Sequence, residues 1–474
     1  MKRLRLSTFI KASLALALLI SSLPWPSAAL ALTEDTQYIV KYSRDCPRGG
    51  GPDRGPRFDV VSARELETLL AEDALEWYEE DGYALLADSP PLPEETAPFH
   101  EDAQWNLDLI NAGAAFSLGY MGQGVRVGVI DSGIAPHACL EGRLAEGRNY
   151  ITDAADPDDT TDYYGHGTKV AALIAGADDN GFIGAAPMAE VVPLKCTDGK
   201  SVKISAICRA VYGGIDDYGC SVLNLSLATS TDYESLREAM EYAAEKNVTV
   251  VAAAGNISSK AVAYYPALYD TVIGVGSVDS SGSWYGGSNY FDGCVSVAAP
   301  GTGLRSANYA GGFSYYISGT SFAAPQVSAA AAVLLSVCGS LTPGQIADIL
   351  TGYAADAGDE GFDRYFGWGI LDVGGSVAAL TGRTAEGDDC SLIPGEDGGP
   401  ARAVLNNTDR ALTCVCVTAL YGDLGQYLGS TLYTLTVPPG ESADLALPDG
   451  GYECVQYVLS QAMIPLTPAL KTLK

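Results

Sequence analysis

Residues 127–133, Val-Gly-Val-Ile-Asp-Ser-Gly, form an apolar run that ends in an aspartate and a glycine-bounded turn. Runs of Val, Ile and Leu without polar alternation are typical of parallel strands that are covered on both faces. Further runs of this kind lie at residues 191–195, 221–227, 249–254 and 271–275. Helical patterns lie at residues 166–176, 203–217, 232–246 and 321–338. This alternation predicts an α/β domain with a mostly parallel, doubly wound sheet.

Three segments of this domain place a reactive side chain at the end of a predicted element. Asp131 ends the first strand, at the edge where parallel sheets form their sites. His166 lies between two glycines at the start of a helix, and the chain has only 3 histidines. Ser321 opens an apolar helix, whose N-terminal dipole favours an oxyanion. Each feature alone is also consistent with an ordinary turn or helix cap.

Together these segments supply the three side chains that acyl transfer requires. Ser321 would attack the carbonyl carbon, His166 would take and return the proton, and Asp131 would orient and stabilise the imidazolium. A fourth segment, residues 251–256, ends a buried run in Gly-Asn. The amide of Asn256 can donate to the tetrahedral oxygen, together with the backbone N–H of Ser321.

The motifs VIDSGI around Asp131, GHGT around His166 and SGTSFAAP around Ser321 resemble the subtilisin family of serine peptidases. The chain order Asp, His, Ser is also the order in that family. The resemblance covers residues 101–381. It implies a serine endopeptidase that acts on protein or peptide substrates and needs no cofactor for its chemistry.

The resemblance extends to the substrate cleft. The stretch Asn-Leu-Ser-Leu-Ala at 224–228 resembles the strand that pairs with extended substrate, which implies contacts from Ser226, Leu227 and Ala228. Tyr264 stands where relatives often have a small residue at the floor of the first specificity pocket. We therefore expect a reduced preference for large aromatic residues before the scissile bond.

Composition and hydrophobic pattern divide the chain into a signal peptide (1–31), a small α+β propeptide (32–100), the peptidase domain (101–381), a linker (382–400) and a small β-sandwich-like accessory domain (401–474). The α+β segment has strand patterns at 37–42 and 83–87 and a helical pattern at 63–78. The family resemblance implies that this segment assists folding and inhibits the enzyme intramolecularly until it is cut off. We expect that cut between Asp88 and Gln104.

The charge balance limits the possible partners. Asp and Glu number 58 against 28 Lys and Arg, which gives a net charge of -30. Such a chain is repelled by nucleic-acid backbones and anionic membranes, so nucleic-acid partners are not expected. The acidic surface and the basic, apolar N-terminal segment predict a monomer that is secreted, either to the medium or to the cell surface.

Cysteines and acidic clusters leave two questions open. Six of the 11 cysteines lie in the α/β domain and four in the tail, which allows up to three and two disulfides, although several could be simple buried residues. Five aspartates precede His166 and could bind a structural calcium ion, or could form a solvated loop: Asp153, Asp156, Asp158, Asp159 and Asp162. Cys139 lies near a calcium-binding Asp of many relatives, which puts that family site in doubt.

Other functions agree less well with the sequence. An α/β-hydrolase esterase needs a G-x-S-x-G turn, and the chain has none. The glycines near residue 122 precede the first strand, whereas those that bind a dinucleotide phosphate follow it. The alternative from another class is a binding protein on a subtilisin scaffold, non-catalytic or only self-processing, and the intact Asp, His and Ser argue against it.

Overall fold

The computed structural model describes residues 36–43, 58–87, 104–177, 182–381, 390–393, 403–406, 412–421, 427–438, 441–444, 453–460 and 470–472. The predicted signal peptide and most of the predicted linker lie outside these residues. The chain divides into two compact units, one up to Asp81 and one from Gly82 onward.

The first unit is a three-stranded antiparallel sheet with one helix. Its elements are β1 (Gln37–Tyr42), β2 (Phe58–Ser62), α2 (Ala63–Ala71) and β3 (Leu75–Glu80), and β1 is the central strand. Ser62 and Glu65 form a capping box that starts α2. The predicted helix at 63–78 is therefore wrong beyond Ala71. The chain turns through Asp73, whose φ is 51°, and residues 75–80 alternate between partly buried and exposed, as a strand does.

A seven-stranded parallel sheet forms the centre of the second unit, which confirms the parallel-sheet prediction. Its order is β13-β12-β11-β9-β5-β7-β6. The strands are β5 (Arg126–Asp131), β6 (Arg148–Asn149), β7 (Glu190–Lys195), β9 (Val222–Leu225), β11 (Thr249–Ala253), β12 (Val272–Val278) and β13 (Val297–Pro300). Except for the short edge strand β6, these strands are almost entirely buried, which explains their unbroken apolar patterns.

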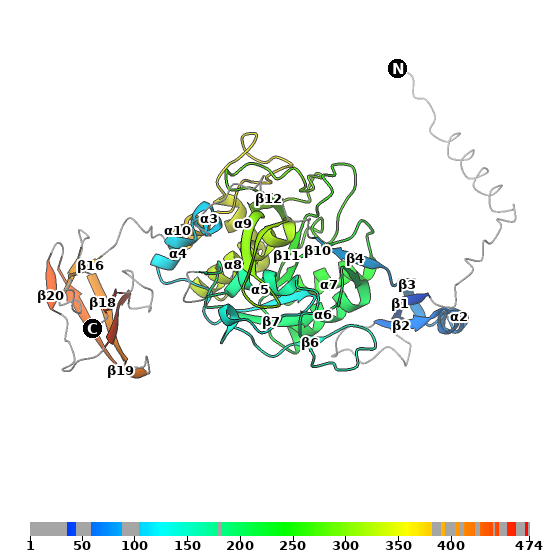
Figure 1. Cartoon of the computed structure of the whole chain (residues 1–474), viewed down its shortest axis with the longest axis horizontal. Coiled ribbons are helices and arrows are strands. Elements are labelled where there is room, and N and C mark those ends of the chain that lie inside the picture. The colour runs from blue at the N-terminus through cyan, green and yellow to red at the C-terminus, as the bar shows by residue number, and fades with distance from the viewer. Residues whose placement is uncertain are drawn as a thin grey trace, which may run out of the picture. The chain divides into compact units, whose positions relative to one another are not determined.

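Helices cover both faces of this sheet (Figure 1). Helix α5 (Gly167–Ala175) packs against α8 (Thr320–Val337), and α6 (Ile204–Asp216) packs against α7 (Glu234–Glu245). The other helices are η1 (Ala138–Leu140), α3 (Trp105–Leu109), α4 (Ala112–Ser117), α9 (Pro343–Gly352) and α10 (Val373–Thr381). Helices α5, α6, α7 and α8 match the four predicted positions to within two residues at each end.

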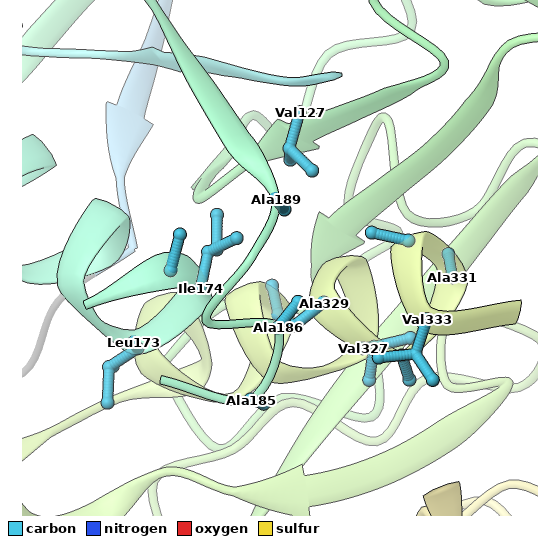
Figure 2. Packing of buried hydrophobic residues seen from close by; sticks show 14 of the residues in the cluster. Val127, Leu173, Ile174, Ala185, Ala186, Ala189, Val327, Ala329, Ala331 and Val333 are labelled. Carbon is cyan, nitrogen blue, oxygen red and sulfur yellow. The ribbon is translucent and has the colours of Figure 1, made fainter. Parts of the chain in front are cut away.

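Helix α8 lies in the core of the second unit. Figure 2 shows its Val327, Ala329, Ala331 and Val333, together with Ile174 of α5 and other small apolar residues. Within the described part of the chain, α8 is the one helix long and apolar enough to cross a membrane, and 89% of that window is buried. Burial on this scale identifies α8 as a core helix.

Shorter strands complete the second unit. Strand β4 (Tyr83–Leu86) lies between β10 (Leu227–Ala228) and β8 (Ser201–Lys203), and both pairings are antiparallel. The predicted strand at 221–227 is thus divided at Ser226 into β9 and β10. Strands β14 (Thr302–Ala307) and β15 (Phe313–Ser318) form a hairpin.

The C-terminal segment is β-rich, as predicted. One antiparallel sheet has the order β16-β17-β20 and another β19-β18-β21-β22. The strands are β16 (Cys390–Ile393), β17 (Ala403–Asn406), β18 (Leu412–Tyr421), β19 (Tyr427–Val437), β20 (Ser442–Asp444), β21 (Glu453–Ser460) and β22 (Leu470–Thr472). That these sheets pack as a sandwich stays a prediction.

The cysteines of the α/β domain correct one expectation. None of the six forms a disulfide, so the three possible bridges are not made: Cys139, Cys196, Cys208, Cys220, Cys294 and Cys338. Five of them are buried and act as small apolar side chains in the core. Burial raises the pKa of Cys220 to about 12 and that of Cys294 to about 11. A hydrogen bond with Ser340 lowers the pKa of the partly exposed Cys338.

Thiol labelling tests this arrangement. Unfolded protein that has never been reduced should contain at least six reactive thiols, because these six cysteines form no disulfides. In the native protein the Cys338→Ser variant should lose one rapidly labelled thiol, whereas Cys294→Ser should lose none. Fewer than six thiols after unfolding would contradict the structure.

Candidate active site

The candidate site lies where the strand order of the parallel sheet reverses. From β5 the chain goes to β7 on one side and then crosses to β9 on the other. Ligands of open α/β sheets bind outside the carboxyl ends of the strands at such a point. Asp131 is the last residue of β5 and is fully buried.

His166 immediately precedes helix α5 and faces Asp131. Its Nδ1 lies 2.8 Å from Oδ1 and 2.8 Å from Oδ2 of Asp131. This contact assigns the proton to Nδ1 and leaves Nε2 as the basic nitrogen. The imidazole is 2% exposed, and its ring centre lies 5.5 Å from that of Phe322.

The two glycines beside His166 are required by close contacts. Gly165 has a φ of +90°, and a Cβ there would lie 2.4 Å from the ring of Tyr309. A Cβ at Gly167 would lie 2.2 Å from the backbone oxygen of Gly133 and 3.2 Å from Oδ1 of Asp131. The sequence Gly-His-Gly thus allows the backbone to pass close to the turn after β5.

Ser321 lies in the first turn of α8 and shares two hydrogen bonds with Ser226. The Ser321 hydroxyl donates to the backbone oxygen of Ser226 at 3.0 Å, and the Ser226 hydroxyl donates to the backbone oxygen of Ser321 at 2.8 Å. The second bond replaces a missing helical one, because Pro325 has no N–H to donate to Ser321. Ser226 therefore holds the first turn of α8 against the end of β9.

Asn256 follows β11 and has a fixed side-chain orientation. Its Oδ1 accepts hydrogen bonds from the backbone N–H of Thr320 at 2.9 Å and from the Thr320 hydroxyl at 3.0 Å. Its Nδ2 consequently points the other way and donates to the backbone oxygen of Ala87. The backbone N–H of Ser321 donates to the same oxygen at 3.1 Å. Two donors thus converge on one carbonyl, the arrangement of an oxyanion hole.

The carbonyl in this hole belongs to the residue that follows β4. The Ala87 N–H donates to the backbone oxygen of Ser226 at 3.0 Å. Leu86 pairs with Leu227, and Leu85 pairs with Ala228 on one side and Ser201 on the other. Residues 83–87 of the chain therefore lie in the site as an extended peptide between two strands.

The structure places the residues predicted for the site in three sets of contacts. Asp131 contacts His166, Ser321 and Asn256 contact one carbonyl, and Ser226, Leu227 and Ala228 contact the β4 segment. The sequence reasoning missed Thr320 and strand β8. Thr320 could have been considered because it directly precedes Ser321 in the sequence. Strand β8 has only three residues, which is too short a segment to predict from its sequence.

Tyr264 packs near the oxyanion site. Its Cδ1 lies 3.5 Å from where a Cβ of Gly255 would stand, next to Asn256. Burial raises the pKa of its phenol. The ring therefore occupies space beside the residue that holds the Ala87 carbonyl.

The residues considered for calcium have other roles in the structure. Both Asp162 oxygens accept protein hydrogen bonds, and Asp156 and Asp159 accept bonds from backbone N–H groups of their own loop. The fully buried thiol of Cys139 lies 3.1 Å from Nδ1 of His137 and is not a hard oxygen ligand. No group of three or more His, Cys, Asp or Glu suited to a metal ion occurs among the described residues.

Comparisons with known proteins agree with this geometry. The model of the subtilase family matches residues 122–369. Subtilisin DY of Bacillus licheniformis is 33% identical over 277 residues, which are 57% of this chain and 96% of that protein. An alkaline protease of Shouchella clausii is 30% identical over 66% of this chain and 77% of its own. Subtilisin E of Bacillus subtilis is 30% identical over 78% of this chain and 98% of its own.

A glycine substitution tests the packing around His166. Gly165→Ala should lower the free energy of unfolding by about 2–4 kcal/mol, because it adds a clash with Tyr309 to the cost of a left-handed φ. Gly124→Ala is the matched control, since Gly124 has a φ of +76° and no atom within 4 Å of its Cβ position. Denaturant unfolding of both variants measures the difference. Equal losses would show that the Tyr309 contact is unimportant.

Proposed function

This chain belongs to the subtilase family and is a serine-type endopeptidase, and on that premise we propose that Asp131, His166 and Ser321 are its catalytic triad. The observation that carries the proposal is the Ala87 carbonyl, which accepts hydrogen bonds from Asn256 and from the N–H of Ser321. Subtilases need no cofactor for catalysis, and every step below uses only side chains and backbone groups of the chain.

The proposed reaction proceeds through an acyl-enzyme. Ser321 Oγ turns from Ser226 to the substrate carbonyl carbon while His166 Nε2 takes its proton. The resulting imidazolium is stabilised by Asp131, and it then protonates the leaving amine. Water attacks the ester in the second half, again with His166 as the base.

Asn256 and the N–H of Ser321 stabilise the tetrahedral oxyanion in this proposal. Thr320 holds the Asn256 amide in place before the reaction begins, so little reorganisation is needed when the charge develops. Preorganised donors of this kind are among the largest contributors to catalysis of acyl transfer.

We propose further that the enzyme is made as a zymogen that cuts itself after Ala87. The Ala87–Asp88 bond is the one whose carbonyl accepts from the oxyanion donors. This moves the expected cut to one residue before the stretch from Asp88 to Gln104. Pairing of β4 with β8 and β10 supports inhibition by the same segment after cleavage, because its backbone fills the substrate position.

The proposal also includes export of the protein from the cell. The N-terminal segment has the charge and apolar pattern of a signal peptide, and a net charge of -30 suits a protein that is free in solution. We propose that the protein acts outside the cell, on protein or peptide substrates, as a monomer.

Substitution of the nucleophile tests the central claim. Ser321→Ala should lower kcat by about 10⁶-fold and prevent formation of a new N-terminus at Asp88. Asn256→Ala should lower kcat by about 10²–10³-fold, because one oxyanion donor is lost. Hydrolysis of casein and N-terminal sequencing measure both effects.

The outcomes of these experiments distinguish an endopeptidase from a protein that only processes itself. Maturation with casein hydrolysis, both lost in Ser321→Ala, supports the endopeptidase. Maturation without hydrolysis of casein or of varied peptides would support a protein that only processes itself. Full activity of Ser321→Ala would refute the proposed triad.

The β4 segment also suggests a substrate preference. Ala87 occupies the position before the scissile bond, and Tyr264 lies beside the neighbouring Asn256. Leu86 and Ala84 are buried in the cleft, whereas Leu85 and Tyr83 are exposed. We propose that the enzyme prefers a small residue before the cut and Leu one residue earlier.

A peptide series tests this preference. Peptides ending in Ala-Leu-Leu-Ala before the cut should be hydrolysed faster than those with Phe in the last position. Tyr264→Ala should raise kcat/KM for the Phe peptide relative to the Ala peptide by about 10-fold or more, the scale of hydrophobic pocket effects. Wild-type preference for Phe or Tyr would refute the proposal.

A further inference from the structure

Asp162 is a buried carboxylate that the proposed reaction does not use. It is 1% exposed and accepts five hydrogen bonds. Oδ1 accepts from the Ser132 hydroxyl at 2.9 Å and from the N–H groups of Tyr164 at 3.0 Å and Gly165 at 2.6 Å. Oδ2 accepts from the N–H of Thr168 at 3.0 Å and from its hydroxyl at 2.7 Å.

These donors lie on both sides of His166 in the chain. Gly165 directly precedes His166, and Thr168 follows it by two residues in the first turn of α5. A carboxylate that bonds both positions fixes the backbone from which the imidazole extends. The hydrogen bond from the Thr168 N–H also uses the positive end of the helix dipole.

The same carboxylate reaches Asp131 through Ser132. The Ser132 hydroxyl lies 2.9 Å from Oδ1 of Asp162 and 3.2 Å from Oδ1 of Asp131, and it accepts from the Gly167 N–H at 3.0 Å. Asp162 therefore joins the turn after β5, which carries Asp131, to the turn that carries His166. The 2.8 Å contacts between Asp131 and His166 depend on the spacing of these two turns.

We propose that Asp162 is a positioning residue for catalysis, whose buried carboxylate holds Asp131 and His166 in the geometry that proton transfer requires. The inference rests on the proposed triad and adds a residue to it. The side chain of Asp162 offers acceptor oxygens to donors on two sides, at Oδ1 and at Oδ2. In an Asp162→Asn variant an NH₂ group would replace one of the two carboxylate oxygens. The protein N–H and hydroxyl groups that bond that oxygen would then have no acceptor.

The charge of Asp162 also acts on the imidazolium. His166 faces Asp131 of β5 and the apolar ring of Phe322 on α8, and Asp162 bonds the backbone on both sides of it, at Gly165 and Thr168. On α5, Lys169 Nζ donates to the backbone oxygen of Gly165 at 2.6 Å.

At the end of β7 lie Cys196, a thiol within the field of Asp131, and Lys195, which pairs with Asp198 at 2.6 Å. Within this set of charges, loss of the Asp162 charge disfavours the protonated imidazole. The acid limb of the kcat/KM profile should therefore move to lower pH.

The test compares Asp162→Asn with Asp159→Asn. Asp159 lies on the same loop, but its side chain accepts from the Thr161 N–H and the Tyr163 hydroxyl and not from the groups that Asp162 holds. Asp162→Asn should lower kcat by about 10–100-fold, with KM within about twofold, because a small misplacement of the base costs rate and not binding. Asp159→Asn should behave as the wild type.

Self-processing gives a second readout. The β4 segment already lies in the cleft, so its first cleavage requires no substrate binding step. Its rate in Asp162→Asn should fall by the same factor as kcat. A lower melting temperature with unchanged kcat and an unchanged acid limb would assign Asp162 a purely structural role and overturn the proposal.

Ser132→Ala and Ser132→Thr decide the matter if Asp162→Asn does not fold. Ser132→Ala keeps the carboxylate but removes the link to Asp131, so kcat should fall and the loss should be rescued by Thr, which restores a hydroxyl. Unchanged kcat in Ser132→Ala would overturn the proposal. Inactivity of the wild type, or full activity of Ser321→Ala, would instead refute the triad on which the inference rests.

Discussion

Burial of helix α8 is the constraint on which the site depends. The helix contacts strands β9, β11, β12 and β13 and also helix α5, and its alanines allow this close approach. Its first turn therefore has no freedom to move relative to the sheet, and Ser321 is fixed with it. Because α5 packs on α8, the position of His166 is set by the same contact. Enlarging a buried alanine of α8 would displace Ser321 and His166 together.

The site is built from backbone groups at the ends of core elements, and the side chains complete them. Ser226 follows β9 and bonds Ser321 in both directions, while Thr320 orients the amide of Asn256 after β11. These bonds satisfy groups that the secondary structure leaves open, such as the Ser321 carbonyl opposite Pro325. Rigidity at the reacting atoms thus follows from the ordinary demand that buried polar groups be paired. Residues 83–87 add a strand to this framework by backbone pairing.

The parallel sheet could be predicted because its strands are buried on both faces, and the ends of those strands identified Asp131 and Asn256. Local sequence patterns gave wrong or missing predictions where contacts between residues distant in the sequence determine the structure. Residues 75–80 continue a helical spacing of leucines yet form β3, because they pair with β1. Strand β8 exists through its pairing with β4, which no neighbouring residue indicates. Whether two cysteines form a disulfide depends on where the fold places each thiol, and the spacing of cysteines in the sequence does not encode this.

Two buried carboxylates, Asp131 and Asp162, lie at this end of the sheet, and hydroxyl and N–H groups hold both of them. Neutral donors stabilise a buried negative charge without cancelling it, so the field of both carboxylates reaches the imidazole. That field opposes the charge of an attacking oxygen but favours an imidazolium, which forms only when the proton has moved. In the proposed mechanism the oxyanion is stabilised instead by Asn256 and the N–H of Ser321, the two groups that bond the Ala87 carbonyl. The proposed acyl transfer thus uses the carboxylates at the end of β5 for the imidazolium and the neutral donors after β11 and in α8 for the oxyanion.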